Sequence, residues 1–269
     1  MAIRDITLGQ YYPAESPIHS LDPRVKIISA LLYLVSLFLV KSIVFFVLPI
    51  IFIAAVIIIS KVPFKFMTKG LKSIVFLIIL TAVVNAFCTP GEVIFSVWKL
   101  SLTIEGIQRA FFMAVRLVLL IFGSSLLTLT TKPIALTDGL ERLMKPLSKI
   151  GVPSHEIAMM MTIALRFIPT LLDETDKIMK AQQARGADFE NGGIKEKAKA
   201  LIPLLVPLFV SAFRIAGDLA MAMEARCYHG GEGRTRMNEM KLKSSDAVAA
   251  VIVLVYFAAI IASGYITFI

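Results

Sequence analysis

The sequence has few of the residues that usually hold metals or form disulfides. Its 269 residues include only two cysteines, Cys88 and Cys227, and three histidines. One cysteine lies in an apolar run and the other in a charged segment, and no Cys-x-x-Cys or Cys/His ligand spacing occurs. We therefore expect neither a structural disulfide nor a metal site.

Other absences exclude further classes of protein. The chain has no Walker A pattern, so it does not bind ATP by that route. Residues 1–24 have no apolar core, so we expect no cleaved signal peptide. The basic residues do not alternate with aromatic ones, which argues against nucleic-acid binding. No duplicated transmembrane halves suggest a secondary transporter.

Apolar residues, by contrast, are abundant and form long runs. They make up 57% of the chain, and the mean hydropathy is +0.81. These values are typical of a membrane protein. The net charge of +9 indicates basic cytoplasmic loops first, and anionic lipid or acidic partner surfaces second. We expect an all-α membrane protein with about five transmembrane helices and additional amphipathic helices.

The apolar runs predict where the chain crosses the bilayer. The run 25–59 would form a helix of roughly 50 Å at about 1.5 Å per residue, against a hydrocarbon core of about 30 Å, so we divide it at Lys41-Ser42. The expected spans are 25–40, 42–59, 71–87, 107–129 and 247–269. The expected domains are a polar segment 1–24, a four-span region 25–130, a charged helical region 131–244 and a last span 245–269.

Loop charges predict the orientation. The basic stretches 61–72 and 132–243 belong inside, whereas 88–106 has no positive bias and belongs outside. That outer loop contains the only tryptophan, Trp98, which suits a membrane interface. We therefore expect the N-terminus in the cytoplasm and the C-terminus outside. Arg116 lies near mid-depth in the fourth span, where it serves either as a structural tie to a neighbouring helix or as a functional contact.

Two long helical patterns occupy the charged region. The first runs from 154 to about 185 and contains Pro169; the second runs from about 194 to 228 and contains Pro203 and Pro207. A proline in mid-helix removes a backbone hydrogen bond, so we expect all three to bend their helices, with Arg166 also at the bend of the first.

Both patterns are apolar early and polar late, which is typical of helices that lie in or against the membrane and end at a water-side partner. The alternative is two ordinary spans over 159–172 and 201–216. Arg166 and Arg214 weigh against that alternative because each would place a charge in an apolar segment.

Each long pattern closes on nearly the same tripeptide. Ala184-Arg185-Gly186 and Ala225-Arg226-Cys227 lie 41 residues apart, and the double glycines Gly192-Gly193 and Gly230-Gly231 come after them. A second alanine lies three residues before each motif, at Ala181 and Ala222, so each helix end presents a face of small side chains.

We interpret these motifs as two docking ends. Glycine suits a helix C-cap, and arginine offers a planar set of donors to a carboxylate in an acidic groove. The alternative is that each arginine only complements the helix dipole, an effect worth under about 1 kcal/mol. Because the motif is duplicated with matched alanines, we favour docking.

A third motif precedes the first span, at His19-Ser20-Leu21-Asp22-Pro23-Arg24. Asp22 followed by Pro23 predicts a helix N-cap with proline at the first helical position. This explanation leaves His19 without a role.

Taken together, these residues give the chain a resemblance to the transmembrane (T) component of energy-coupling factor (ECF) transporters, the EcfT family, which is related to the cobalt-transporter component CbiQ. The resemblance spans essentially the whole chain. It rests on Gly9-Gln10-Tyr11, Ser16, His19, Leu21-Asp22-Pro23-Arg24, Thr130-Thr131, Arg166-Phe167-Ile168-Pro169 and the two arginine motifs.

The resemblance implies a division of labour. Two cytoplasmic ABC-type ATPase subunits would bind ATP and Mg²⁺, and this chain would be a non-enzymatic subunit without a cofactor of its own. Arg185 and Arg226 would each hold one ATPase. The long helices would pass motion to a substrate-binding (S) component for a vitamin or a metal ion. Its platform would include Met160, Ile168, Leu172, Leu205, Phe209 and Phe213.

One departure concerns the second motif, which has Cys227 where the family has glycine. Cysteine fits this position only if a positive φ is not required, which leaves the geometry of the second cap open, and we still assign the docking role to Arg226. Two other interpretations stay open. The chain could be a dedicated cobalt, nickel or biotin T component, or an intramembrane enzyme using His155, Glu156 and Arg116, although these three lack the spacing of a catalytic set.

Overall fold

The computed structural model describes residues 11–40, 42–97, 100–187, 189, 193–231 and 240–266. Gly9, Gln10, Lys41, Trp98 and Gly192, which the sequence analysis singled out, lie outside them. The chain divides into two compact units. We call the part within Leu140–Glu239 the helix-pair unit, and the part within Gly9–Gly139 and Met240–Ile269 the bundle unit.

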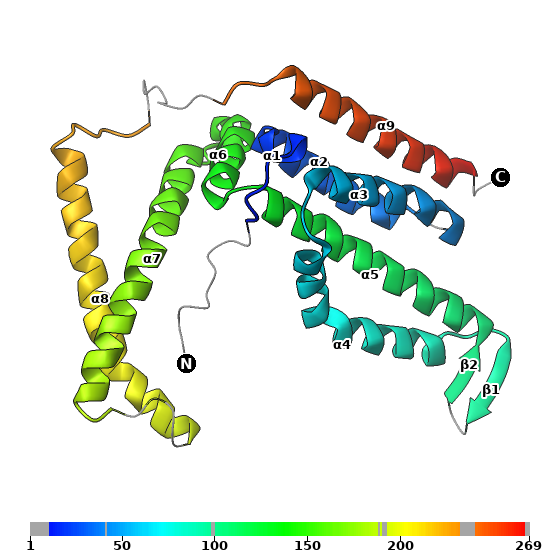
Figure 1. Cartoon of the computed structure of the whole chain (residues 1–269), viewed down its shortest axis with the longest axis horizontal. Coiled ribbons are helices and arrows are strands. Elements are labelled where there is room, and N and C mark those ends of the chain that lie inside the picture. Colours follow the sequence, from blue (N-terminus) through cyan, green and yellow to red (C-terminus); the bar gives the residue numbers. More distant parts are fainter. Residues whose placement is uncertain are drawn as a thin grey trace. The chain divides into compact units, whose positions relative to one another are not determined.

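The bundle unit contains the shorter apolar helices (Figure 1). In chain order these elements are α1 (Pro17–Ser20), α2 (Pro23–Leu39), the 3-10 helix η2 (Ile43–Phe46), α3 (Val47–Ser60), α4 (Phe64–Cys88), β1 (Val93–Val97), β2 (Leu100–Thr103), α5 (Ile104–Thr130) and α9 (Ser244–Ile266). Helix α5 packs against α2, α3 and α4, and α9 packs against α2. The core between them includes Tyr33, Leu37, Leu126, Tyr256 and Ile260.

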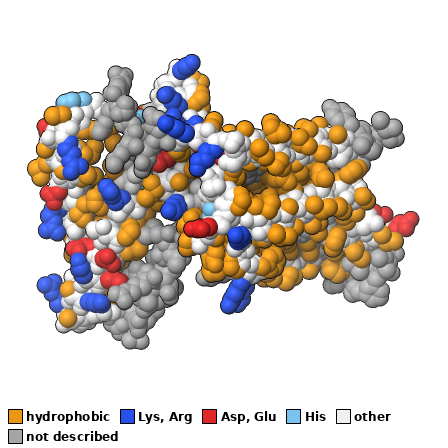
Figure 2. All heavy atoms as spheres, turned by 45° about the horizontal axis from the view of Figure 1, so that its top comes forward, with side chains coloured by type: hydrophobic (Ala, Val, Ile, Leu, Met, Phe, Trp, Pro, Cys, Tyr) orange, Lys and Arg blue, Asp and Glu red, His pale blue; other side chains and the backbone are white. Residues whose placement is uncertain are grey.

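Outward side chains of this bundle are strongly apolar. Figure 2 shows hydrophobic side chains over most of the visible face of the bundle. Large exposed hydrophobic residues occur on α2, α3, α4 and α9 alike, as Phe38, Ile58, Phe76 and Val255 illustrate. A soluble helix would place polar residues there, so this surface suits contact with lipid.

The 93–103 connector forms a two-stranded antiparallel hairpin. Val97 pairs with Leu100 and Ser96 with Ser101. The β-branched and aromatic residues of β1 favour this extended form. Thr103 then caps α5: its hydroxyl accepts from the Gly106 N–H at 3.0 Å and donates to the Thr89 carbonyl at 2.9 Å. The hairpin is a small addition to an otherwise helical membrane protein.

Five helical segments are long and apolar enough to cross a membrane, or up to six if the bent pair Phe64–Lys72 and Ile74–Cys88 is one span. The five are Ile43–Ser60, Ile104–Thr130, Ser154–Ala184, Leu201–Glu224 and Ser244–Gly264. The chain is therefore a multi-pass membrane protein. The set differs from the expected one in three ways: α2, at the expected span 25–40, has only 17 residues; the expected span 71–87 qualifies only within the bent pair; and the two long helices qualify. Length and apolarity therefore do not distinguish the two long helices from ordinary spans.

The helix-pair unit consists mainly of α7 (Ser154–Ala184) and α8 (Ile194–Glu224), preceded by the 3-10 helix η3 (Lys145–Ile150). Helix α6 (Pro133–Met144) spans the boundary between the units. Helices α7 and α8 pack against each other and run in opposite directions (Figure 1). Their C-terminal ends, and hence the two arginine motifs, lie at opposite ends of this pair.

Candidate partner-docking motifs

The first motif ends α7 with a complete backbone cap. Arg185 is the C-cap residue, and Gly186 has a φ of +89°. The Gly186 N–H donates to the Gln183 carbonyl at 2.9 Å, and the Ala187 N–H donates to the Gln182 carbonyl at 3.0 Å. This pair of bonds is the Schellman motif, which satisfies carbonyls that the last helical turn leaves without donors.

The second motif repeats this cap bond for bond. The Cys227 N–H donates to the Glu224 carbonyl at 2.8 Å, and the Tyr228 N–H donates to the Met223 carbonyl at 3.1 Å. Cys227 has a φ of +55°, in the left-handed region. The expectation that cysteine fits here only where no positive φ is required is therefore wrong, because the backbone hydrogen bonds hold Cys227 in a conformation that glycine usually takes.

Side chains at the two ends are also disposed alike. Arg185 and Arg226 are both exposed, as are the alanines that precede them, Ala181, Ala184, Ala222 and Ala225. Within the described part of the helix-pair unit, neither guanidinium has a hydrogen-bond or ion-pair partner. Each helix end thus presents a five-donor cation next to a face of small side chains, which is suited to an incoming carboxylate.

Prolines in α8 create a further contact between the two helices. The carbonyl of Pro203 would normally accept from the N–H four residues later, but residue 207 is also proline and has no N–H. The Gln182 side chain from α7 supplies the donor instead, with Nε2 3.2 Å from the Pro203 oxygen. Sequence reasoning missed Gln182, although the spacing of the two prolines identifies the carbonyl that needs a partner.

A second cross-helix bond joins Ser211 and Glu174, with the Ser211 hydroxyl donating to Oε1 at 3.5 Å. Pro169 lies inside α7, and Pro203 and Pro207 lie inside α8. That these prolines bend the helices for coupling stays a prediction. Arg166, one turn before Pro169, is exposed.

Residues expected to form a platform lie on α7 and α8 with uneven exposure. On α8, Leu205, Phe209 and Phe213 are spaced four apart and form one apolar stripe, with Phe213 76% exposed. On α7, Met160 is exposed, whereas Ile168 and Leu172 are half-buried. The α8 stripe is the stronger candidate surface, because its large side chains have little cover within the chain.

The N-terminal motif lies in the bundle unit and is built into a polar network. Asp22 caps α2 as expected, accepting from the Arg24 N–H at 2.9 Å, and Pro23 is the first helical residue. The Arg24 guanidinium returns to the Asp22 carboxylate at 2.7 Å. Buried Asp246 at the start of α9 accepts from the Asp22 N–H at 2.8 Å and from the Lys243 N–H at 2.7 Å.

Lys26 extends this network to α5. Its Nζ donates to the carbonyls of His19 and Thr130, both at 3.0 Å. Gly139 of α6 also approaches closely, because a Cβ there would lie 2.9 Å from the Pro23 Cβ. The motif therefore ties the start of α2 to the ends of three other helices, a role that depends on Asp246 and Lys26, which the sequence analysis did not select.

His19 takes a defined tautomer in this network. Its Nε2 lies 3.0 Å from the Tyr12 carbonyl, which can only accept, so Nε2 carries the proton. Nδ1 lies 2.7 Å from the Ser16 hydroxyl and accepts from it. Burial lowers the pKa of His19 below its ordinary value, and the nearby charge of Lys26 acts in the same direction.

Arg116 is a structural tie between helices. Its Nη2 donates to the carbonyl of Val40, the C-cap residue of α2, at 3.0 Å. The guanidinium also lies over the Phe112 ring, with Cζ 4.6 Å from the centroid. These contacts satisfy an otherwise orphaned carbonyl at a helix end and shield the charge.

His155 has a partner within the helix-pair unit. Its Nδ1 lies 3.1 Å from Oε1 of Glu141. Gly231, the second residue of the double glycine after Arg226, packs against the imidazole so closely that a Cβ would overlap the ring. His155 therefore holds the segment that comes after the second arginine motif.

Comparison with known proteins agrees with these features. The family model for CbiQ, cobalt transport protein, matches residues 14–237. The chain belongs to the EcfT/CbiQ family.

Three similar relatives are each named energy-coupling factor transporter transmembrane protein EcfT. The Clostridium kluyveri protein is 60% identical over 256 residues, which cover 94% of each chain. That of Ruminiclostridium cellulolyticum is 53% identical over 99% of this chain and 100% of its own. That of Bacillus subtilis is 46% identical over 94% of this chain and 96% of its own.

Membership in the EcfT/CbiQ family makes the chain a transmembrane component of an ECF transporter. The relatives' names describe a transporter membrane subunit and no enzyme. The residues that resembled the family lie in both units: the N-terminal motif in the bundle unit, and both arginine motifs in the helix-pair unit.

Proposed function

We propose that this chain is the non-catalytic coupling subunit of an ECF-type ABC importer. It links ATP hydrolysis by two cytoplasmic ATPase subunits to a substrate-binding S component that takes up a vitamin or a metal ion. The observation that carries the proposal is the pair of matching helix ends, each with an exposed arginine that has no partner among the described residues.

Two ends suit two ATPases. Each ATPase would offer a groove with an acidic wall, and the small alanine side chains would let its surface approach the helix backbone. ATP and Mg²⁺ would be bound in those partner subunits, because this sequence carries no Walker A pattern. The antiparallel pair of α7 and α8 would then transmit movement from one docking end to the other, through the Gln182–Pro203 contact.

The exposed apolar stripe of α8 supports the S-component platform. Leu205, Phe209 and Phe213 would contact a membrane-embedded partner, together with Met160, Ile168 and Leu172 of α7. The loop charges support an N-terminus in the cytoplasm and a C-terminus outside. With α7 and α8 lying against the cytoplasmic side of the membrane and not crossing it, both arginine motifs would face the compartment that contains ATP.

An affinity purification tests the docking role. The wild-type chain and an Arg185→Glu/Arg226→Glu double variant would be purified in mild detergent from their native membrane, with partners identified by mass spectrometry. Arg214→Glu is the matched control, because Arg214 is an exposed arginine on α8 away from its end. We expect ATPases with the wild type and the control only. Equal recovery of the ATPases with the double variant would mean that the two arginines only complement their helix ends and do not dock the ATPases.

The same experiment decides the substrate class. Several different S components with one preparation indicate a shared T component, and a single metal or biotin S component indicates a dedicated one. The intramembrane enzyme is not proposed further, because Arg116 is bonded to Val40 and His155 to Glu141.

A further inference from the structure

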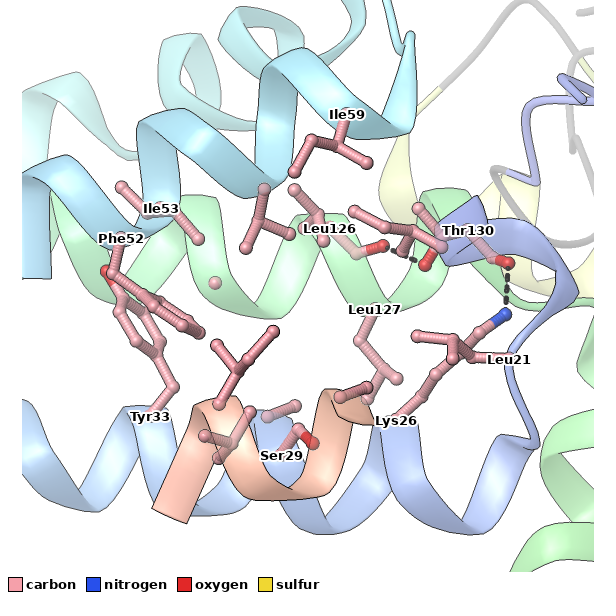
Figure 3. A pocket seen from close by; sticks show the side chains of 17 residues that line it. Leu21, Lys26, Ser29, Tyr33, Phe52, Ile53, Ile59, Leu126, Leu127 and Thr130 are labelled. Atoms are coloured by element: carbon pink, nitrogen blue, oxygen red, sulfur yellow. Dashed lines mark hydrogen bonds between the residues drawn. The ribbon is translucent and has the colours of Figure 1, made fainter. Parts of the chain in front are cut away.

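The bundle unit contains a cavity of 220 Å³ between its helices (Figure 3). It is bounded by α1, α2, α3, α5 and α9. Most of its lining side chains are aliphatic or aromatic, and only a few polar side chains reach it. The lining includes Lys26, Tyr33, Phe52, Ile59, Ala249 and Ile252.

The two ends of the cavity differ. At one end, Lys26 already donates to the carbonyls of His19 and Thr130, so its charge is held in the polar network. At the other end, the Tyr33 ring stacks on Phe52 with centroids 5.9 Å apart. Tyr33 follows Lys26 by two helical turns, or about 10 Å along α2. The cavity is therefore an elongated apolar slot with its polar end next to the N-terminal motif.

Two lining residues also belong to the outer surface. Ile59 of α3 is 49% exposed, and Ile252 of α9 is 54% exposed. These two side chains therefore border both the slot and the apolar outer face of the bundle. In a bilayer this face meets hydrocarbon, and a cavity with so few polar groups does not hold ordered water. The material in contact with its opening is the acyl region of the membrane.

We propose that this slot binds one acyl chain of a membrane phospholipid. The chain passes between Ile59 and Ile252, and its methyl end lies toward Tyr33 and Phe52. The headgroup stays outside, at the level of the N-terminal motif. Gly123 contributes to the shape of the slot, because any Cβ at this position would overlap the Tyr33 ring, which packs against α5.

Photolabelling in vesicles tests the site directly. The full-length chain would be reconstituted in phosphatidylcholine vesicles containing a trace of phosphatidylcholine with a diazirine on its acyl chain. After irradiation, labelled residues would be mapped by mass spectrometry. We expect label on buried Leu126 and Val253, which line the slot, at a yield comparable to that on exposed Phe76 of α4. Label on Phe76 with none on the slot residues would overturn the proposal, and this measurement needs no variant.

A filling substitution provides the second arm. Ala249→Phe adds a ring to a side chain that lines the slot, whereas Ala258→Phe adds the same ring to an exposed position of α9 away from it. We expect Ala249→Phe to remove at least nine-tenths of the label on the slot residues and to leave the labelling of Phe76 unchanged. Ala258→Phe should change neither the slot label nor the Phe76 label. Slot labelling that survives Ala249→Phe would mean that the label reports a transient opening and no bound chain.

Discussion

Gly186 and Cys227 occupy the same position in the two arginine helix ends, yet only one of them is a residue that takes a positive φ at little cost. Their φ angles are +89° and +55°, and the backbone hydrogen bonds around them match. A left-handed conformation costs a residue with a Cβ about 1–2 kcal/mol. The second end thus keeps the same cap although its residue disfavours a positive φ.

The segment after the second cap makes a contact outside its own helix. After Cys227, the Gly230-Gly231 segment packs onto His155. The second end is therefore fixed by a contact outside its own helix, and this contact offers a way to alter one docking end alone.

The largest effect is expected from charge reversal at single ends. Removing one partner of a buried, hydrogen-bonded charge pair costs about 2–5 kcal/mol, or more than tenfold in affinity. If the two ends are equivalent, Arg185→Glu and Arg226→Glu should each weaken the binding of an ATPase subunit by about 2–5 kcal/mol. Titration of purified ATPases against the chain in nanodiscs measures it, with Arg214→Glu as the control. Wild-type affinity in both variants would remove the basis of the docking proposal.

A smaller effect, confined to the second end, is expected from Gly231→Ala. The new Cβ would overlap the His155 ring, and such overpacking costs about 1–3 kcal/mol. The thermal unfolding midpoint in detergent should fall. Gly217→Ala is the matched control, because nothing lies within 4 Å of a Cβ there. In a His155→Ala background, Gly231→Ala should lower the unfolding midpoint much less. An equal decrease in both backgrounds would mean that the loss of stability does not come from overlap with the His155 ring.

The comparison of the caps themselves predicts effects of opposite sign. Gly186→Ala should weaken the first cap by about 1 kcal/mol, and Cys227→Gly should strengthen the second by a similar amount. Amide exchange of Ala187 and Tyr228 reports each cap, because these N–H groups donate the closing bonds. Exchange should speed up about fivefold in the first variant and slow by a similar factor in the second. Changes of the same sign would show that the two caps are not equivalent.

A further prediction concerns the Gln182–Pro203 contact between α7 and α8. Gln182→Leu leaves the Pro203 carbonyl without its donor and should cost about 0.5–1.5 kcal/mol. Pro207→Ala restores an N–H that can serve this carbonyl from within α8. Gln182→Leu should therefore cost less in the Pro207→Ala background, as a double-mutant cycle of unfolding would measure. Additive effects would mean that the bond contributes nothing to the pairing of the helices.

Local signals predicted the motifs well, because capping and polarity depend on near neighbours. Asp22 with Pro23 began α2 as expected, and both long helices ended at their arginine motifs. Contacts between distant segments could not be read this way. Asp246 binds the Asp22 backbone across more than 200 residues, and Gln182 meets Pro203 only because α7 and α8 pack together. The positive φ of Cys227 contradicts residue preference, since the cap's hydrogen bonds outweigh it.

The smallest predicted effect lies in the bundle unit, where His19 titrates. Because burial lowers its pKa in the folded chain, the unfolded chain binds the proton more readily. The contribution of His19 to stability is therefore complete above the ordinary pKa of about 6.5 and is lost as pH falls through the lower folded value. Protonation would add a second cation beside Lys26 and remove the acceptor for the Ser16 hydroxyl.

Thermal unfolding between pH 7.5 and 5 should show a loss of stability that His19→Gln reduces. If the His19→Gln variant keeps the wild-type pH profile, the loss of stability at low pH comes from other groups. A flatter profile, with amide exchange in the helix-pair unit unchanged, would place the titrating group in the bundle unit.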